Sequence, residues 1–493
     1  MTTAPTAGPA TETFDSLNPA TDEVIGTYPV HGADQVRAAV GRARQAAAWW
    51  DSLGFDGRAE RLARWRGILA RRLPELCEVV SRETGKPRGD AQLEIVLAIE
   101  HLAWAAKNAR KVLGRKRRAP GLLLANQAAT VEYQPLGVVG VIGPWNYPVY
   151  TPLGSVSYAL AAGNAVVFKP SEYTPAVGAW LVDAFAEAVP EQPVLQLVTG
   201  FGATGAALTT AGVDKIAFTG SAATGRKVMA AAAETLTPVV IEAGGKDPVL
   251  VDADADLDAA ADATVWGAFS NAGQTCAGVE RVYVHERVYD EFVAKVVAKA
   301  RDVNPGADYG PMTMPSQLDV VRRHITDALA RGGRALVGGK DAVGERFVEP
   351  TVLVDVPEDS AAVREETFGP TVTIARVADM DEAIEKANDS AYGLGSTVFS
   401  RRRGMELARR LRTGQTAINA PLSFAGIAAL PFGGLGDSGF GRIHGPEGLR
   451  EFARPKAIAR QRFTAPIALT TFARTPRTEA LVGKLITKLH GRR

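Results

Sequence analysis

The stretch Val138-Val-Gly-Val-Ile-Gly-Pro-Trp-Asn-Tyr-Pro148 decides the fold class, because a short uncharged run rich in valine and isoleucine ends at a polar turn bounded by prolines. Similar short apolar runs follow, and they are separated by segments with helical periodicity. The clearest of these helical segments are residues 175–188 and 222–234. These further runs occupy residues 165–168, 194–198, 215–218 and 238–241. Continuous apolar strands that alternate with helices predict a parallel, doubly wound α/β sheet covered on both faces.

Four short polar or glycine-containing stretches follow strands of this sheet, at residues 144–148, 169–172, 219–225 and 242–246. An open parallel sheet binds its ligands beyond the carboxyl ends of its strands. The sequence therefore predicts that the binding site lies at this edge of the sheet.

The rest of the chain supplies a helical region before the sheet and a second α/β pattern after it. Apolar residues recur at helical spacing from 33 to about 118, and the basic run 115–118 that closes this region favours a solvated helix end over a contact with nucleotide or anionic lipid. The second pattern runs from about 248 to 436, with strands at 279–284, 371–376 and 397–400 and helices at 289–300 and 381–388. Residues 1–14 are predicted to form a loose, disordered tail, and the chain after Phe452 is basic and irregular.

Composition places the chain among ordinary globular proteins. Hydrophobic residues make up 46% and charged residues 22% of the 493 residues. With 56 basic and 54 acidic residues, the chain has no strong positive electrostatic field that would attract nucleic acid. The two cysteines, Cys77 and Cys276, fit a reducing compartment, and no run approaches the ~18 apolar residues of a membrane span. We expect a cytoplasmic protein without nucleic-acid partners, and the six scattered histidines predict no metal site.

Cys276 stands in the stretch Asn-Ala-Gly-Gln-Thr-Cys-Ala-Gly at 271–278, where small neighbours let the backbone approach a substrate closely. Its thiolate is the strongest nucleophile that a side chain offers near neutral pH. A buried cysteine that only fills space is the commoner fate of a single free thiol, so the residue alone leaves both interpretations open.

Glu242 and Asn146 supply two further reactive groups. Glu242 ends an apolar strand, where poor solvation would raise its pKa and make it a usable general base, although it could equally pair with Lys246. Asn146 lies on a stiff turn between Trp145 and Tyr147. Its amide could stabilise an oxyanion, whereas a turn asparagine that bonds the backbone is the commoner case.

Candidate nucleotide-binding residues lie at two other strand ends. Gly220, Ser221 and Gly225 follow a strand and open a helix, an arrangement whose free N–H groups suit a phosphate. Lys169 and Glu172 suit the two hydroxyls of a ribose, and an ordinary surface ion pair is equally compatible. The string at 200–205 matches Gly-x-Gly-x-x-Gly, but no acidic residue closes a following strand, so a turn and a helix start are favoured there.

Taken together, these stretches resemble the aldehyde dehydrogenase superfamily over residues 17–458. The motifs that carry the resemblance are Pro-Trp-Asn at 144–146, Lys-Pro-Ser-Glu at 169–172, Phe-Thr-Gly-Ser at 218–221, Glu-Ala-Gly-Gly-Lys at 242–246, Gly-Gln-Thr-Cys at 273–276, Glu-Glu-Thr-Phe-Gly-Pro at 365–370 and Pro-Phe-Gly-Gly at 431–434. Cys276 stands 34 positions after Glu242, the spacing of the hydrolytic members. Seven motifs in the same order make the resemblance specific.

The resemblance implies the mechanism of a hydrolytic aldehyde dehydrogenase. Cys276 would attack the aldehyde, the Asn146 side chain and the Cys276 N–H would hold the oxyanion, and Glu242 would activate the water that hydrolyses the thioester. Hydride would pass to NAD, with NADP as the alternative. Glu172 favours NAD, because a carboxylate repels a 2′-phosphate. The other cofactor-binding residues that the family implies are Trp145, Lys169, Gly220, Ser221, Gly225, Glu366 on the nicotinamide ribose and Phe368 beside the ring.

The resemblance also implies three structural parts. These are a Rossmann-type cofactor domain at 15–118 and 133–245, an α/β catalytic domain at 246–450, and a small β oligomerisation element at 119–132 with 451–475. The family forms homodimers and homotetramers. Residues 476–493 form a basic amphipathic tail, in which Leu481, Leu485 and Leu489 share a helical face. Peripheral contact with an anionic membrane and packing against a partner subunit both explain this tail, and packing is favoured.

Departures from the family pattern bear on the substrate and on proton transfer. Residues 144–168 and 419–434, which should line the substrate entrance, contain no charge, and Gly154 leaves room there, so an apolar aliphatic or aromatic aldehyde is predicted. The alternatives are a succinate-semialdehyde type, which would need a basic residue, a coenzyme A-acylating type, against which Glu242 argues, and a non-catalytic binding or structural member. Ile443 replaces a glutamate that many members place after Gly-Arg, so Glu242 would need another proton route.

Overall fold

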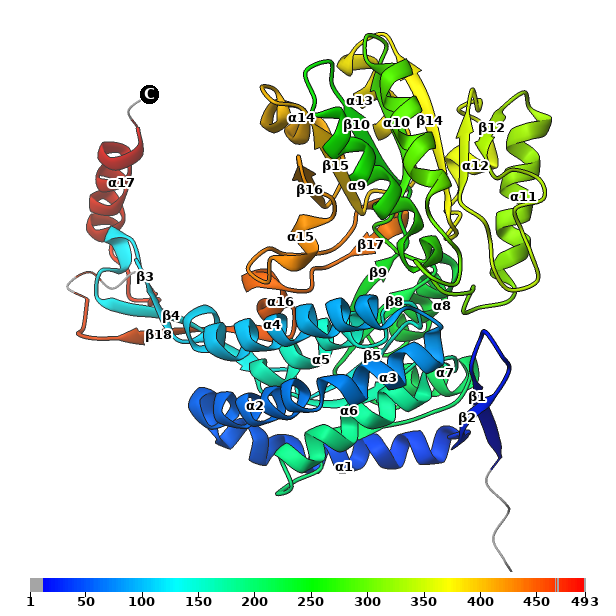
Figure 1. The fold of residues 1–493 in the computed structure, drawn as a ribbon. Coiled ribbons are helices and arrows are strands. Elements are labelled where there is room, and N and C mark those ends of the chain that lie inside the picture. The colour runs from blue at the N-terminus through cyan, green and yellow to red at the C-terminus, as the bar shows by residue number, and fades with distance from the viewer. Residues whose placement is uncertain (1–11, 466, 468–469, 492–493) are drawn as a thin grey trace, which may run out of the picture. The chain divides into compact units, whose positions relative to one another are not determined.

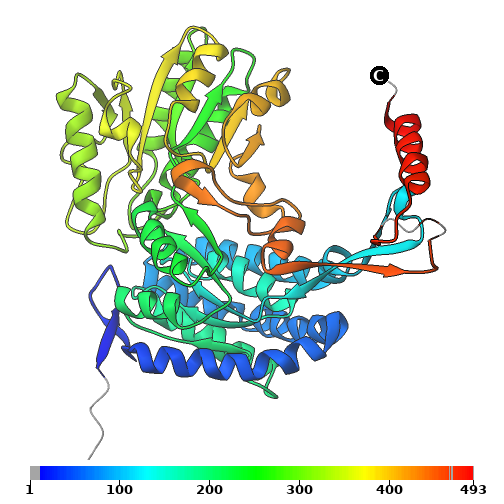
Figure 2. The same ribbon diagram turned by 180° about the vertical axis from the view of Figure 1, so that it is seen from behind.

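The structure is a computed structural model that describes residues 12–465, 467 and 470–491. It divides into two compact units, which are described separately. Unit 1 comprises Met1–Leu113 and Pro135–Arg454, and unit 2 comprises Gly114–Gln134 and Pro455–Arg493. Figures 1 and 2 show the helices and strands of both units from opposite sides.

Unit 1 begins with a hairpin and four helices. Strands β1 (Thr13–Leu17) and β2 (Val24–Pro29) pair antiparallel, and the Phe14 ring packs 5.0 Å from the ring of Phe201. The predicted loose tail is therefore wrong at Thr13 and Phe14, whereas residues 1–11 lie outside the described part of the chain. The helices are α1 (Ala33–Ser52), α2 (Gly54–Arg71), α3 (Leu73–Thr84) and α4 (Arg88–Leu113).

The six-stranded sheet of unit 1 has the order β17-β9-β8-β5-β6-β7. Its five parallel strands are β5 (Val138–Ile142), β6 (Ala165–Lys169), β7 (Leu195–Leu197), β8 (Lys215–Gly220) and β9 (Val239–Ala243). Helices α5 (Tyr150–Ala162), α6 (Pro175–Ala188), α7 (Gly202–Thr210) and α8 (Ala222–Ala233) connect these strands and, with α1, contact the sheet (Figure 1). The predicted alternation of apolar strands and helices is confirmed, and β5 and β6 are buried along almost their whole length.

The seven-stranded sheet of unit 1 has the order β12-β13-β14-β11-β10-β15-β16, and all neighbours are parallel except β12 and β13. Its strands are β10 (Asp247–Val251), β11 (Val279–His285), β12 (Arg334–Val337), β13 (Thr351–Val354), β14 (Thr371–Val377), β15 (Gly395–Phe399) and β16 (Gln415–Ile418). Its helices are α9 (Leu257–Phe269), α10 (Tyr289–Arg301), α11 (Gln317–Ala330), α12 (Ala361–Arg364), α13 (Met380–Asn388) and α14 (Gly404–Arg410), and α15 (Ser423–Gly426) and α16 (Gly445–Glu451) follow.

The chain returns from the second sheet to the first through the short strand β17 (Gly439–Phe440). Gly439 lies opposite Glu242, and the pairing with β9 is antiparallel. Gly439 has a φ of 98°, and a side chain there would strike the carbonyl of Ile241, so only glycine fits. The end of β9 that carries Glu242 is therefore held on both sides, by β8 and by β17.

The described residues of unit 2 form a three-stranded sheet in the order β18-β4-β3, a short 3₁₀ helix at Leu122–Leu124 and one α-helix. Strand β3 (Lys116–Arg118) pairs antiparallel with β4 (Gln127–Pro135), β18 (Ala453–Gln461) lies on the other side of β4, and α17 (Pro476–His490) follows. No described helix of either unit is both long and apolar enough to cross a bilayer.

Two sequence predictions are wrong in this part of the chain. Residues 115–118 do not end a helix, because α4 stops at Leu113 and residues 116–118 join a ladder with residues 129–131. The chain after Phe452 is not irregular, because β18 completes the sheet along the other edge of β4. β3 is held by pairing with residues 11 to 15 positions later, and β18 by pairing with a strand more than 300 residues earlier. Local periodicity reveals neither pairing.

Candidate active site

Cys276 follows a strained turn at the end of α9. Asn271, Ala272 and Gly273 hold positive φ angles of 53°, 55° and 70°. This conformation costs a non-glycine residue about 1–3 kcal/mol. Gly273 is required, since a side chain there would strike the carbonyl of Gly369. The turn therefore presses the loop that carries the thiol against residues 369–370.

Cys276 and Glu242 both line two cavities of unit 1. One cavity, of about 250 Å³, is bordered mainly by aromatic and aliphatic side chains. The other, of about 350 Å³, is lined by residues 219–221 and by Glu366 and Phe368. A nucleophile and a carboxylate that border both spaces can act on a molecule that reaches across the junction.

Burial changes the protonation of both groups. It raises the pKa of Glu242 to about 7, and the nearby Cys276 thiol and Thr219 hydroxyl offset this only in part. Neither carboxylate oxygen has a described hydrogen-bond partner in good geometry. Burial also raises the pKa of Cys276 well above that of an ordinary thiol, with the charge of Glu242 as the second cause. Lys246, the alternative partner for Glu242, pairs with Glu280 instead. The site therefore holds a protonated thiol beside a carboxyl group that exchanges its proton near neutrality.

Asn146 is fixed through its side chain and its backbone. Its Nδ2 donates to the Gln274 carbonyl at 3.0 Å, and its own carbonyl accepts from Lys86 Nζ at 2.8 Å and from Asn271 Nδ2 at 3.1 Å. Lys86 also pairs with Glu94 at 2.7 Å, and both of these side chains are buried. The second amide proton of Asn146 makes no hydrogen bond with a described residue, and Asn146 lines the larger of the two cavities.

Sequence reasoning missed these supporting residues. Asn271 and Gln274 lie in the stretch around the cysteine, but nothing there shows which carbonyl their amides meet. Lys86 precedes Asn146 by 60 residues, and its spacing of eight residues from Glu94 is the only local signal of a pair. Such a spacing is common on ordinary helix surfaces, so it could not have identified the contact.

The larger cavity brings together eight of the predicted site residues. They are Trp145, Asn146, Gly220, Ser221, Glu242, Cys276, Glu366 and Phe368. Ser221 caps α8 by accepting the Thr224 N–H at 3.3 Å, so the N-terminus of that helix borders the cavity. The Trp145 and Phe368 rings pack edge to face, 5.6 Å apart, and a side chain at Gly244 would overlap the Glu366 carboxylate. A helix N-terminus, an aromatic pair and a carboxylate fit the phosphates, the flat ring and the hydroxyls of a nucleotide cofactor.

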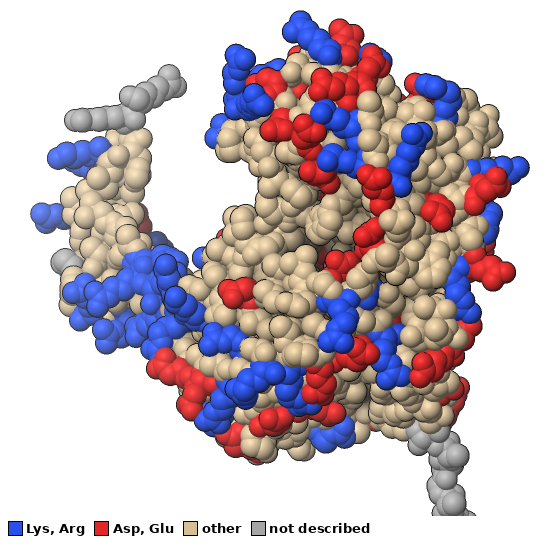
Figure 3. All heavy atoms as spheres, in the orientation of Figure 1, with Lys and Arg blue, Asp and Glu red and all other residues tan. Residues whose placement is uncertain are grey.

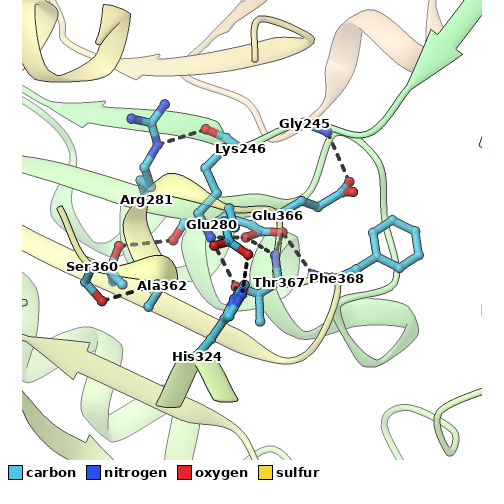
Figure 4. A network of polar contacts seen from close by, with 12 residues as sticks. Gly245, Lys246, Glu280, Arg281, His324, Ser360, Ala362, Glu366, Thr367 and Phe368 are labelled. Atoms are coloured by element: carbon cyan, nitrogen blue, oxygen red, sulfur yellow. Dashed lines mark hydrogen bonds and ion pairs between the residues drawn. The ribbon is translucent and has the colours of Figure 1, made fainter. Parts of the chain in front are cut away.

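A buried carboxylate anchors the segment that carries Glu366 and Phe368. Figure 4 shows Glu280, on β11, among Lys246, Thr367 and Phe368. It accepts the main-chain N–H groups of Thr367 at 2.9 Å and of Phe368 at 3.1 Å, and it pairs with Lys246. Phe368 is held at a φ of 51°. Glu280, which the sequence reasoning missed, therefore fixes a strained segment at the edge of the cavity.

The other three predicted site residues are not among those that line this cavity. Lys169 Nζ donates to the carbonyl of Pro170 at 2.9 Å and lies 3.9 Å from Glu172. Glu172 borders a separate cavity of about 480 Å³ beside the β1–β2 hairpin. Gly225 faces Ile241 of β9, so its lack of a side chain permits close packing of helix on strand. The ribose and phosphate roles of these residues stay predictions.

The smaller cavity has an apolar wall and acidic rather than basic charges. Its apolar and aromatic lining includes Leu93, Leu97, Tyr147, Tyr150, Trp266, Leu422, Phe432 and Ile443. The charged residues among its described lining are Asp90, Glu94 and Glu242, with no lysine or arginine. The contribution of α4, through residues 90–97, was not predicted, because nothing local in that helix marks the face that meets the cavity.

Gly154 does not open this cavity to substrate. A Cβ at Gly154 would lie 2.6 Å from Nε2 of His444, so the space is already filled. The His444 ring also lies 3.8 Å from the ring of His101, and burial lowers the pKa of His101 to about 4. The prediction that Gly154 leaves room at the entrance is therefore wrong.

Similarity to known proteins extends along nearly the whole chain. The model of the aldehyde dehydrogenase family matches residues 6–458. A 4,4'-diapolycopene aldehyde oxidase of Methylomonas sp. is 40% identical over 452 residues, which cover 90% of this chain and 85% of that protein. A Mycobacterium ulcerans (strain Agy99) protein, provisionally named as an NADP-dependent succinate-semialdehyde dehydrogenase, is 38% identical over 463 residues, which cover 92% and 89%. The crystal structure of an NAD-dependent aldehyde dehydrogenase from Sinorhizobium meliloti matches with a TM-score of 0.88 at 33% identity and covers 93% of each chain.

Proposed function

The chain belongs to the aldehyde dehydrogenase family, and we propose that it oxidises an aldehyde to a carboxylic acid through a covalent intermediate on Cys276, with NAD as hydride acceptor. One observation carries this proposal: Cys276 and Glu242 line both the apolar cavity and the cavity with nucleotide-binding features. The nucleophile and the base therefore each have access to the substrate side and to the cofactor side of the reacting carbon.

Attack on the aldehyde begins with the loss of the Cys276 proton. Glu242, with a pKa that burial raises to about 7, is the nearby group that can accept this proton. The sulfur then adds to the carbonyl carbon, and the oxygen that becomes negative is stabilised by the Asn146 amide and the Cys276 N–H. The contacts of Asn146 with Gln274 and Lys86 support this role, because they fix the amide before substrate arrives.

A nicotinamide dinucleotide supplies the acceptor for the hydride that leaves the substrate carbon. Trp145 and Phe368 offer the aromatic wall for its ring, and Glu366 offers a carboxylate for ribose hydroxyls. Gly220 and Ser221 place the N-terminus of α8 where it can bind the phosphates. Gly225 lets the first turn of α8 pack closely against Ile241 of β9. Lys169 and Glu172 are proposed for the second ribose, where the carboxylate disfavours the 2′-phosphate of NADP.

Glu242 activates the water that hydrolyses the thioester on Cys276, after the proton that it took from the thiol has passed to solvent, which a pKa of about 7 permits. Its two oxygens make no hydrogen bond to a described residue, so both can accept a proton from water. This supports hydrolysis over transfer to coenzyme A, and the intact set of Cys276, Asn146 and Glu242 supports a catalytic over a purely structural role.

The smaller cavity supports an apolar aliphatic or aromatic aldehyde as substrate. Asp90 would repel an aldehyde that carries a carboxylate, whereas the charge of Glu94 is already compensated by Lys86. The described lining residues include no basic group to receive such a carboxylate. Succinate semialdehyde, which appears in the name of the mycobacterial relative, is the second candidate.

NADH formation with octanal, benzaldehyde and succinate semialdehyde tests the reaction and the substrate class together. We expect turnover of octanal or benzaldehyde that disappears in Cys276→Ala while NAD binding persists. Turnover that survives in Cys276→Ala would overturn the mechanism, and faster oxidation of succinate semialdehyde than of octanal would overturn the substrate class. Repeating the assay with NADP, and with Glu172→Gln, tests the cofactor preference.

We further propose a homodimer or homotetramer that assembles through strands β3, β4 and β18 of unit 2, as the family resemblance implies. Light scattering of the purified protein measures the mass, and a monomer at assay concentration would contradict the proposal. The free thiols Cys77 and Cys276 support a reducing, cytoplasmic compartment.

A further inference from the structure

Helix α17 carries an apolar stripe that the described structure leaves exposed. Leu481, Ile486 and Leu489 are 52%, 36% and 43% exposed, and no residue of the helix is buried. Val482 and Leu485, which share the stripe, are half-buried. A helix of 15 residues is marginal in water by itself. The stripe therefore calls for an apolar partner.

The charge of unit 2 favours an anionic partner. Its described residues include eleven basic side chains against two carboxylates, Glu132 and Glu479. The basic residues are Arg115, Lys116, Arg117, Arg118, Lys456, Arg460, Arg462, Arg474, Arg477, Lys484 and Lys488. Among the residues described, none of the eleven forms an ion pair. Six of the eleven, among them Arg474, Arg477, Lys484 and Lys488, lie outside β3 and β18, the strands proposed for subunit assembly. Figure 3 shows lysine and arginine gathered over the strands of unit 2 and along α17, on the face drawn there.

The position of the lysines on α17 matters as much as their number. At 3.6 residues per turn, Lys484 and Lys488 lie along one border of the stripe formed by Leu481, Leu485 and Leu489, not opposite it. From such a border, the long stem of a lysine lies along apolar surface while its ammonium reaches a polar layer. Apolar and basic groups side by side fit a surface that has an apolar interior and an anionic rim.

We propose that α17 docks unit 2 on an anionic membrane surface, with its leucine stripe among the acyl chains and its lysines at the level of the phosphates. A second copy of α17 is a poorer partner, because it would bring two more lysines to the border of the stripe and add like charge. A bilayer with anionic lipids supplies both the apolar layer and the opposite charge. The docking does not depend on the reaction. If the proposed function also holds, the enzyme works beside the layer in which apolar aldehydes dissolve.

Sedimentation of the full-length protein with vesicles tests the proposal. We expect binding to vesicles that contain phosphatidylglycerol, weak binding to phosphatidylcholine alone, and loss of binding as salt is raised. Lys484→Gln with Lys488→Gln should weaken partitioning about thirtyfold, because each basic residue near an anionic surface contributes about 1 kcal/mol. The matched control, Lys484→Arg with Lys488→Arg, keeps both charges and should bind as the unchanged protein does.

Substitutions in the apolar stripe provide the second arm. Leu481→Ser, Leu485→Ser and Leu489→Ser together should abolish vesicle binding although every lysine remains, and Thr487→Ser, on the opposite side of the helix, should change nothing. Oxidation of propanal in solution and light scattering on the same samples report on folding and on oligomeric state. No binding of the unchanged protein to anionic vesicles overturns the proposal. A leucine variant that binds anionic vesicles as strongly as the unchanged protein also overturns the proposal. If the unchanged protein does not bind vesicles and the leucine variant forms a smaller oligomer, α17 is a subunit contact instead.

Discussion

Lys86 donates its buried ammonium group to the main-chain carbonyl of Asn146 at 2.8 Å and pairs with Glu94 at 2.7 Å. Glu94 in turn accepts the N–H groups of Val149 and Tyr150, at 2.7 and 3.1 Å. The ion pair therefore holds α4 to the turn that carries Asn146 and to the start of α5. The position of the proposed oxyanion donor thus depends on a charge 60 residues earlier in the chain.

Lys86→Met should lower the free energy of unfolding by about 3–5 kcal/mol, because it leaves the Glu94 carboxylate buried without its partner. Adding Glu94→Gln removes that charge while an amide oxygen can still accept the N–H groups of Val149 and Tyr150, so most of the stability should return. kcat should stay about tenfold to a hundredfold low in the double variant, because Asn146 has lost its anchor. Urea unfolding and steady-state kinetics check the two effects, and a double variant with full kcat would show that Lys86 serves stability alone.

Glu242→Gln should lower kcat about 10²- to 10⁴-fold, because an amide cannot take a proton from the attacking water. The protein should fold normally, since the substitution removes a poorly solvated charge. Because Glu242 is also proposed to take the proton of Cys276, formation of the thioester should slow as well, so a rapid first turnover of NADH should be absent in stopped-flow absorbance. Normal turnover in Glu242→Gln would assign the base to another residue.

The pH dependence of kcat should follow the protonation of Glu242. Burial raises the pKa of this carboxyl group to about 7, so it is protonated and inactive as a base below that pH. kcat should therefore fall about tenfold per pH unit on the acid side of about 7 and level off above it. A profile measured with octanal checks this, and the acid limb should disappear from the residual activity of Glu242→Gln.

Asp90→Asn should raise kcat/KM for succinate semialdehyde about tenfold relative to octanal, because it removes a negative charge from the lining of the apolar cavity. Asp319→Asn, on the exposed face of α11, removes the same charge outside both cavities and serves as the control. The ratio of the two kcat/KM values cancels any general loss of activity. An unchanged ratio would mean that the substrate does not reach Asp90.

The histidine pair should make the fold sensitive to acid. Burial lowers the pKa of His101 from 6.5 to about 4 and that of His444 well below its ordinary value, so the unfolded chain takes up protons that the folded chain excludes. Stability should therefore fall as the pH drops from about 6.5 toward 4, with His101 contributing up to about 3 kcal/mol. His101→Gln, which keeps a donor for the Ala425 carbonyl, should weaken this dependence in urea unfolding. An equal slope in both proteins would mean that the loss comes from other groups.

Local signals in the sequence were sufficient for the parallel sheets, but they left the roles of Glu242 and Cys276 open. The segments 138–142 and 239–243 are short, apolar and rich in β-branched residues, so the composition of each segment alone predicts a strand. Glu242 and Cys276 stand in distinctive local surroundings, a carboxylate at the end of an apolar strand and a thiol among small residues. Those surroundings alone are equally compatible with structural roles, and the seven motifs in order along the chain favoured the catalytic interpretation.

The supporting contacts could not be predicted because they join distant segments. Lys86 meets Asn146, Glu280 meets Thr367, and His444 fills the space beside Gly154, at separations of 60, 87 and about 290 residues. Local signals did not reveal strands β3 and β18, because their lysines and arginines disfavour a sheet and only pairing makes them strands. Only the family resemblance placed residues 451–475, which include β18, in a small β element.

Because burial keeps a proton on Cys276, it also affects how fast oxidants can inactivate the protein. Peroxides attack the thiolate and not the thiol, and overoxidation to sulfinic or sulfonic acid is irreversible in most proteins. A thiol with a raised pKa presents little thiolate between turnovers. The burial that keeps the proton on this proposed nucleophile should therefore also make it a poor target for hydrogen peroxide between turnovers.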